Sequence, residues 1–144
     1  MRALIALMLM FGSQAGAECG NLCDNSWWET ATEADVQAEL DGGADVMARN
    51  EWGRTPLHRA GSPEVIQPLL AAGADVMARD AVDNTPLHKA AHYGYAEKIQ
   101  ALLAAGADAK AKDKDGETPW ALSQENEKLK GTKAYWALND AQYN

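Results

Sequence analysis

The sequence predicts an all-α repeat solenoid of about four helix-turn-helix units, with short β-hairpin fingers between units and a capping unit at each end. Three observations support this fold class. Residues 43–49 (Gly-Ala-Asp-Val-Met-Ala-Arg) recur at 73–79 and, more loosely, at 106–112, so the offsets are 30 and 33 residues. A Thr-Pro pair follows each copy, and Leu-Leu pairs precede the second and third copies. Internal periods of this length are typical of solenoids, and 144 residues suit a single domain.

The Thr-Pro pairs predict the start of the first helix in each unit. Thr55, Thr85 and Thr118 stand where a helix needs an N-cap, because a side-chain oxygen there can accept from unpaired backbone N–H groups. The proline that follows is tolerated at the first helical position, where its missing N–H would have had no partner. Each pair therefore marks a helix start.

An apolar stripe predicts the second helix. Ser62-Pro63-Glu64 restarts the chain, and the stripe that follows, at Val65, Ile66, Leu69 and Leu70, recurs at Ile99, Leu102 and Leu103. Gly73 and Gly106 then follow where a helix must stop in a left-handed conformation, which glycine adopts without steric cost. Two short antiparallel helices per unit result.

Turn residues predict the fingers between units. Residues 50–53 (Asn-Glu-Trp-Gly) and 113–116 (Asp-Lys-Asp-Gly) carry turn chemistry. In the middle unit Asp83 replaces the glycine, and aspartate tolerates positive φ better than most residues. We expect this finger to form with some strain.

Both ends of the array show capping features. At the amino-terminal end Trp27-Trp28 take the place of Leu57-His58, and Thr32-x-x-Asp35 resembles a capping box. At the other end Thr132 can cap a final helix. That helix contains Tyr135, Trp136 and Leu138, with Asn139, Asp140 and Gln142 expected to face water.

The second unit departs from the repeat. When Ala60-Gly61 is aligned with Ala90 and Gly94, it has no counterparts of Ala91, His92 and Tyr93. Its first helix should be shorter by nearly one turn.

The Thr-Pro-Leu-His-x-Ala and Gly-Ala-Asp segments, at a period near 33, resemble the ankyrin repeat over about residues 27–143. The resemblance divides the chain into units of about 27–48, 49–78, 79–111 and 112–143. It implies that His58 and His88 are structural, with ring nitrogens bonded to neighbouring backbone and threonine groups. Met47 and Met77 replace the asparagine usual in the family, so we expect somewhat looser fingers.

The amino-terminal end predicts export. Met1-Arg2 is a short basic start, residues 3–11 are apolar, and Ala15-Gly16-Ala17 fits a signal-peptidase site, so residues 1–17 are interpreted as a signal peptide. Spanning a bilayer takes roughly 20 apolar residues, so we expect no membrane insertion after signal removal. The chain resembles secreted ankyrin-repeat proteins of Gram-negative bacteria, and we expect it to be periplasmic or secreted; release into a host as an effector is an alternative.

Residues 18–26 form a short segment that carries both cysteines, Cys19 and Cys23. In an oxidising compartment we expect these two to form a disulfide. The alternative function is a periplasmic thiol-redox or metal-handling protein that uses Cys19 and Cys23, with His92 as a further candidate ligand. The C-x3-C spacing differs from the C-x-x-C of redox motifs.

Charge and motifs exclude several function classes. The net charge of −8 repels phosphate backbones, so no nucleic-acid partner is expected. No nucleophile elbow and no glycine-rich phosphate loop is present, and we expect no catalytic residues and no cofactor. His88 and His92 have the i, i+4 spacing of some metal ligands, but His88 is explained by the resemblance, so no metal site is expected. The chain is not expected to be an enzyme.

The resemblance implies that another protein binds a concave face made of the finger tips and the exposed sides of the first helices. Trp52, Arg54 and Tyr93 are the expected anchors, because aromatic and arginine residues dominate binding hot spots. Much of the positive charge gathers there, which favours an acidic or mixed-charge partner. Alternatively, Trp52 packs against the neighbouring finger and the lysines are ordinary solvated residues. The predicted partner-binding residues are Arg49, Glu51, Trp52, Arg54, Arg59, Arg79, Val82, Asn84, Lys89, His92, Tyr93, Lys114 and Glu117.

Overall fold

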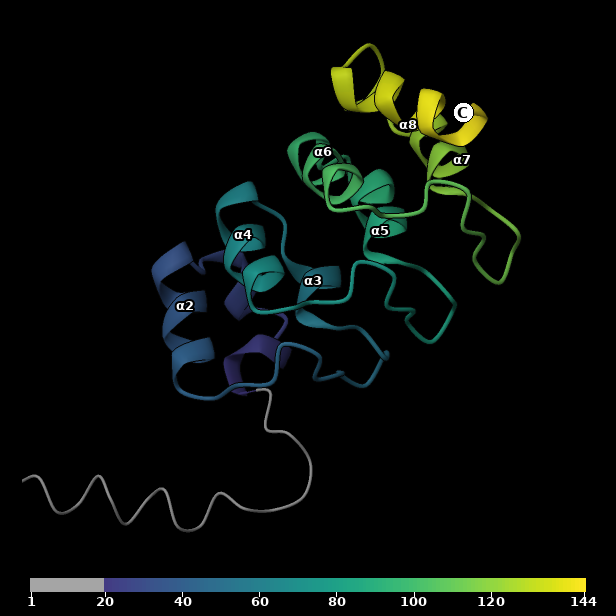
Figure 1. Cartoon of the computed structure of the whole chain (residues 1–144). Coiled ribbons are helices and arrows are strands. Elements are labelled where there is room, and N and C mark those ends of the chain that lie inside the picture. The colour runs from purple at the N-terminus through teal and green to yellow at the C-terminus, as the bar shows by residue number, and fades with distance from the viewer. Residues whose placement is uncertain (1–19) are drawn as a thin grey trace, which may run out of the picture.

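The structure, a computed structural model, describes residues 20–144 and consists there of helices and loops without a β-strand (Figure 1). The expected signal peptide and Cys19 lie outside the described residues. The helices are η1 (Gly20–Cys23), η2 (Trp27–Glu29), α2 (Glu33–Asp41), α3 (Pro56–Arg59), α4 (Pro63–Ala71), α5 (Pro86–Tyr93), α6 (Ala96–Ala104), α7 (Pro119–Gln124) and α8 (Lys133–Tyr143).

The helices stack in two rows, as Figure 1 shows. One row contains the second helices α2, α4, α6 and α8, and the other contains the first helices α3, α5 and α7, each in contact with its neighbour. The loops between units project from the same side of the stack. The predicted all-α repeat solenoid is confirmed. None of the helices between residues 20 and 144 combines the length and apolar character that a membrane span requires.

The predicted helix starts are confirmed at all three Thr-Pro pairs. Thr55, Thr85 and Thr118 are the N-caps of α3, α5 and α7, and proline takes the first helical position each time. The Thr118 hydroxyl oxygen accepts from the Ala121 N–H at 3.3 Å. A hydroxyl cap of this kind contributes about 1 kcal/mol.

The apolar stripes of the second helices form the core between the two rows. Ile66 and Leu69 of α4 and Ile99 and Leu102 of α6 are fully buried and belong to one continuous apolar cluster. Each such side chain contributes roughly 1.5–3 kcal/mol when it leaves water. These helices are followed by Gly73 and Gly106, whose φ values of 89° and 92° are left-handed, as predicted.

The fingers form, but as tight turns rather than the expected β-hairpins, because each turn closes with few ladder bonds. We call residues 49–54, 79–84 and 112–117 the first, second and third finger. The side-chain oxygen of the second residue, Asn50 or its counterparts Asp80 and Asp113, accepts two backbone N–H groups across each turn. Asp83 has a φ of 61°, the left-handed conformation predicted for it.

The methionines of the repeat segments link successive units. Met47 Sδ lies 3.3 Å from the Asp75 backbone nitrogen, and Met77 Sδ lies 3.2 Å from that of Asp108. The fingers were expected to be somewhat looser because methionine lacks the polar groups with which asparagine can hold the finger's backbone. The thioether sulfurs, which are weak acceptors, supply a polar link to the next unit instead.

The caps agree with the sequence at their helix starts and differ on the outer face. Thr32 and Asp35 form the predicted capping box of α2, and Thr132 caps α8. Asp140 is exposed, as expected, whereas Asn139 and Gln142 are half-buried. The Gln142 side chain accepts from the Thr118 hydroxyl at 2.9 Å. Trp136 is instead 56% exposed.

Candidate functional site

The predicted partner-binding residues lie on the three fingers and on α3 and α5, the row of first helices. Trp52, Val82 and Tyr93 are large hydrophobic residues with 43%, 49% and 41% of their surface exposed. The other exposed members are Arg49, Glu51, His92 and Lys114, and the half-buried members are Arg54, Arg59, Arg79, Asn84, Lys89 and Glu117.

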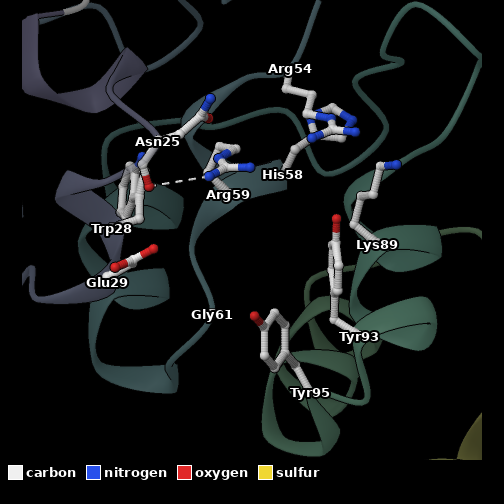
Figure 2. A pocket seen from close by; sticks show the side chains of 10 residues that line it. All are labelled: Asn25, Trp28, Glu29, Arg54, His58, Arg59, Gly61, Lys89, Tyr93 and Tyr95. Atoms are coloured by element: carbon white, nitrogen blue, oxygen red, sulfur yellow. Dashed lines mark hydrogen bonds between the residues drawn. The ribbon is translucent and has the colours of Figure 1, made fainter. Parts of the chain in front are cut away.

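Two pockets on this face bring part of the set together. The first has a volume of about 290 Å³, and Arg54, Arg59, Lys89 and Tyr93 line it (Figure 2). The second, of about 280 Å³, is lined by a set that includes Asn84, Lys89, His92 and Glu117. Lys89 lines both pockets, so they are neighbours along the first helices. The remaining predicted residues lie on the finger loops and line neither of these two pockets.

Three of the predicted cations also hold the fingers together. Arg49 donates to the carbonyl oxygens of Gly53 and Arg79, at 2.7 and 2.5 Å. Arg79 repeats this arrangement with Asp83 and Lys112, at 3.0 and 2.6 Å. The Lys114 ammonium donates to Ala81 of the preceding finger at 2.6 Å. These side chains therefore serve the scaffold whether or not a partner is bound.

Trp52 remains accessible at the tip of the first finger. Its carbonyl oxygen accepts from the Ala81 N–H of the next finger at 3.0 Å, while its ring is exposed. The Arg54 guanidinium lies 5.6 Å from the ring centroid, a cation–π distance. Trp52 is thus partly covered and bonded to the neighbouring finger through its backbone, while 43% of its surface is exposed.

The charges behind the fingers converge on one buried carboxylate. The Asp80 side chain is 1% exposed, and its Oδ2 lies 3.6 Å from both Arg54 Nε and Lys89 Nζ. Its Oδ1 is already bonded to two backbone N–H groups of the second finger. Asp80 thus places two cations of different units side by side.

The histidines of the signature segments are structural, as predicted. His58 Nδ1 lies 3.1 Å from the Thr55 backbone N–H, which donates to it, and His58 Nε2 lies 2.8 Å from Asn84 O. His88 bonds Thr85 and Glu117 in the same way, at 3.1 and 3.0 Å. Burial lowers the pKa of His58 to about 4 and also lowers that of His88.

These hydrogen bonds bear on whether His88 and His92 can bind one metal ion. Both ring nitrogens of His88 are occupied, so it cannot share a metal ion with His92, which is exposed and packs edge-on against Tyr93 at 5.0 Å. Within residues 20–144, ligand atoms of Asp113, Asp115 and Glu117 lie within 4.8 Å of one another. Asp113 is already bonded to the third finger's backbone, which gives it the structural role of Asp80.

Lys98 is a residue of this region that the sequence reasoning missed. It belongs to α6 and is fully buried, and its ammonium donates to the carbonyl oxygens of Leu57, His58 and Ala60, at 2.7, 3.2 and 2.6 Å. Burial, and secondarily the charge of Arg59, lowers its pKa to about 7. The three carbonyl acceptors match the three donors of an ammonium group.

The reason for this contact is the short helix of the second unit. Helix α3 has four residues whereas α5 has eight, as the sequence alignment predicted. In the third unit Ala90 O accepts from the Gly94 and Tyr95 N–H groups. The corresponding oxygen of Ala60 accepts from Lys98 instead. A signal was present in the sequence, since Lys98 stands where the second unit has the core residue Val65.

Two family models match the central part of the chain, residues 52–122. A model of ankyrin repeats in many copies matches residues 69–122, and a model of the single ankyrin repeat matches residues 52–81. No curated protein matched the chain. The residues matched by the two models contain the stacked helix pairs and Thr-Pro helix starts described above. Ankyrin repeats form protein–protein interaction modules. The chain belongs to the ankyrin-repeat family.

Proposed function

We propose that this chain is an exported, non-enzymatic binding module that holds another protein on the face formed by its fingers and first helices. The observation that carries the proposal is the exposure of Trp52, Val82 and Tyr93 on that one face. Exposed aromatic side chains such as Trp52 and Tyr93, set among arginines, are the usual anchors of protein interfaces.

The charge of the face supports a particular class of partner. The chain as a whole carries −8, yet Arg54, Arg59 and Lys89 lie around one pocket. A positive patch on a negative protein favours partners that present an acidic or mixed-charge surface, and it raises their association rate. The net charge disfavours nucleic acid, which would be repelled from most of the surface.

Export and the absence of catalysis are parts of the same proposal. The export step rests on residues 1–17, and it places the mature chain in the periplasm or outside the cell. The two pockets described above, of about 290 and 280 Å³, lie at the lower edge of the roughly 300–1,000 Å³ typical of sites that enclose small molecules. Binding without turnover is the function that this surface favours.

The test is an affinity pull-down from periplasmic extract with residues 18–144 as bait. A Trp52→Ala, Arg54→Ala bait removes the proposed anchors, and a Trp136→Ala, Lys133→Ala bait is the matched control, because both control residues are exposed on α8. One protein that the unchanged and control baits retain and the anchor variant loses would support the proposal. A captured protein that is indifferent to the anchor variant, or no captured protein, would contradict the proposed face.

A further inference from the structure

The missing turn of α3 coincides with a pocket on the face of the first helices. The chain leaves α3 at Ala60 and turns at Gly61, where a β-carbon would lie 3.3 Å from the Tyr95 ring. Figure 2 shows Tyr93 and Tyr95 on one side of this pocket, Trp28 and Glu29 on the other, Arg59 between them and Arg54 above Tyr93. The pocket therefore borders the place where the second unit is shorter than the third.

Positive charge exceeds negative charge in this pocket. Three cations, Arg54, Arg59 and Lys89, line it together with a single carboxylate, that of Glu29, which is exposed. The nearby Asp80 carboxylate is shared between Arg54 and Lys89, at 3.6 Å from each. Among residues 20–144, Arg59 forms no ion pair.

Arg59 is the cation of this pocket that the chain leaves least satisfied. Its guanidinium donates once, from Nη2 to Asn25 O at 3.2 Å, and its buried Nε has no hydrogen-bond partner in the described part of the chain. Arg54 Nε also lacks a hydrogen bond, but it faces the Asp80 carboxylate at 3.6 Å. Burial, and secondarily the charge of Arg54, lowers the pKa of Arg59. A half-buried guanidinium that has no carboxylate partner is an unfavourable arrangement, which an anion at the accessible part of the group would relieve.

The walls of the pocket limit what that anion can be. Tyr93 and Tyr95 lie with ring centroids 5.8 Å apart, and Figure 2 shows their hydroxyl groups directed toward the space between the helices. The volume of about 290 Å³ admits one side chain rather than a folded cofactor. A guanidinium fork binds a carboxylate with two parallel hydrogen bonds, and tyrosine hydroxyls can donate to the same oxygens.

We propose that this pocket binds the carboxylate of a single acidic side chain, glutamate or aspartate, presented by the partner protein, with Arg59 as the principal donor and Arg54 as the second. The inference rests on the proposed function, because it names the chemistry of the group that the binding face receives. It adds that the specificity pocket of this face borders the deletion in the second unit.

The test uses a defined probe on the full exported chain, labelled with ¹⁵N. N-acetyl-glutamate methylamide is titrated while the Nε–H resonances of the arginines are followed, and N-acetyl-glutamine methylamide is the neutral counterpart. We expect a saturable shift at Arg59 Nε–H and Arg54 Nε–H with the glutamate compound and none with the glutamine compound. Arg59→Gln should weaken this binding at least about tenfold, as truncation of one partner in a charged hydrogen-bonded pair does.

Two further variants keep the result interpretable. Lys112→Gln removes a positive charge from the third finger, outside the pocket, and should leave the affinity unchanged. Arg59→Lys keeps the charge but removes the fork, so its affinity should lie between those of the unchanged chain and Arg59→Gln. Because Arg59→Lys retains the buried cation, it answers the question even where Arg59→Gln unfolds.

Several results would overturn the inference. These are equal shifts with the two compounds, unchanged affinity in both Arg59 variants, an equal loss in Lys112→Gln, and tighter binding of inorganic phosphate than of the glutamate compound at the same resonances. None of them affects the proposed function, which the pull-down tests separately. A partner lost with the Trp52→Ala, Arg54→Ala bait but retained by an Arg59→Gln bait would leave the binding face intact and reject the pocket.

Discussion

The ammonium nitrogen of Lys98 lies 2.6 Å from the carbonyl oxygen of Ala60, although the two residues belong to different repeat units. This hydrogen bond and its two neighbours, to Leu57 and His58, take over acceptors that the missing helical turn would have occupied. A deletion in one unit is therefore compensated by a polar residue at a core position of the next.

Replacing this lysine tests the compensation directly. Lys98→Met keeps an unbranched side chain that is one atom shorter and leaves the buried carbonyls of Leu57 and Ala60 without a donor. The free energy of unfolding should therefore fall by roughly 2–4 kcal/mol. Urea denaturation measures the change. Lys110→Met, at an exposed position, should stay within about 0.5 kcal/mol of the unchanged chain. Equal stability of the two variants would mean that water satisfies the carbonyls.

Restoring the missing turn should make the lysine dispensable. An Ala-His-Tyr insertion between Ala60 and Gly61 lets the Ala60 carbonyl accept from the chain itself, as Ala90 does. Lys98→Val alone should lower the free energy of unfolding. In a chain that carries the insertion, the same substitution should lower it much less. The same denaturation assay gives the coupling of the two changes, expected to be about 1–3 kcal/mol. Additive effects would refute the compensation.

The buried histidines predict a loss of stability in acid. The pKa of His58 is about 4 in the fold, below its unfolded value of 6.5, because burial disfavours the imidazolium. The unfolded chain therefore binds the extra proton first, so this contribution is complete above pH 6.5 and is lost as the pH falls toward 4. Its size is about 3 kcal/mol. Denaturation at pH 7 and pH 4.5 should show a smaller difference for His58→Gln than for the unchanged chain.

His92 provides the control for that experiment, because it is exposed. His92→Gln should retain the pH dependence of the unchanged chain. A His58→Gln variant with an undiminished pH dependence would show that other groups cause the acid sensitivity.

Asp83 and Gly116 allow a reciprocal test of backbone strain in the fingers. Asp83 has a φ of 61°, and Gly116, at the same place in the third finger, has a φ of 80°. Because glycine adopts this conformation freely, Asp83→Gly should raise the free energy of unfolding by about 0.5–1 kcal/mol, and Gly116→Asp should lower it by the same amount. The thermal midpoint should shift in the same directions. Thermal unfolding followed by circular dichroism gives both values. Changes of the same sign in the two variants would exclude strain as the cause.

The sequence predicts those parts of the fold that depend on neighbouring residues. Helix starts at Thr55, Thr85 and Thr118 and the left-handed Asp83 follow from local backbone chemistry, so they are confirmed almost residue by residue. The prediction that the polar residues of α8 face water was wrong in part, because Gln142 accepts a hydrogen bond from the Thr118 side chain, 24 residues earlier. Such a contact depends on how two units pack.

The candidate site shows the same division. Exposed Trp52 and Tyr93 follow from their places in the repeat, and their exposure agrees with the prediction. Lys98 was missed because its acceptors are 38 to 41 residues away. The second use of Arg49 and Arg79, as links between fingers, was missed although arginine recurs at the repeat period, a pattern that could have indicated it.

The contact between Lys98 and the second unit also limits the modularity of this array. Repeat proteins gain and lose units by recombination because each unit meets its neighbours through equivalent surfaces. Here the second unit is complete only beside a third unit that carries a lysine in its core. The third unit alone would keep the buried Lys98 ammonium without its acceptors. The second unit alone would keep buried carbonyl groups without a donor. An engineered array that uses either unit therefore has to carry the two together.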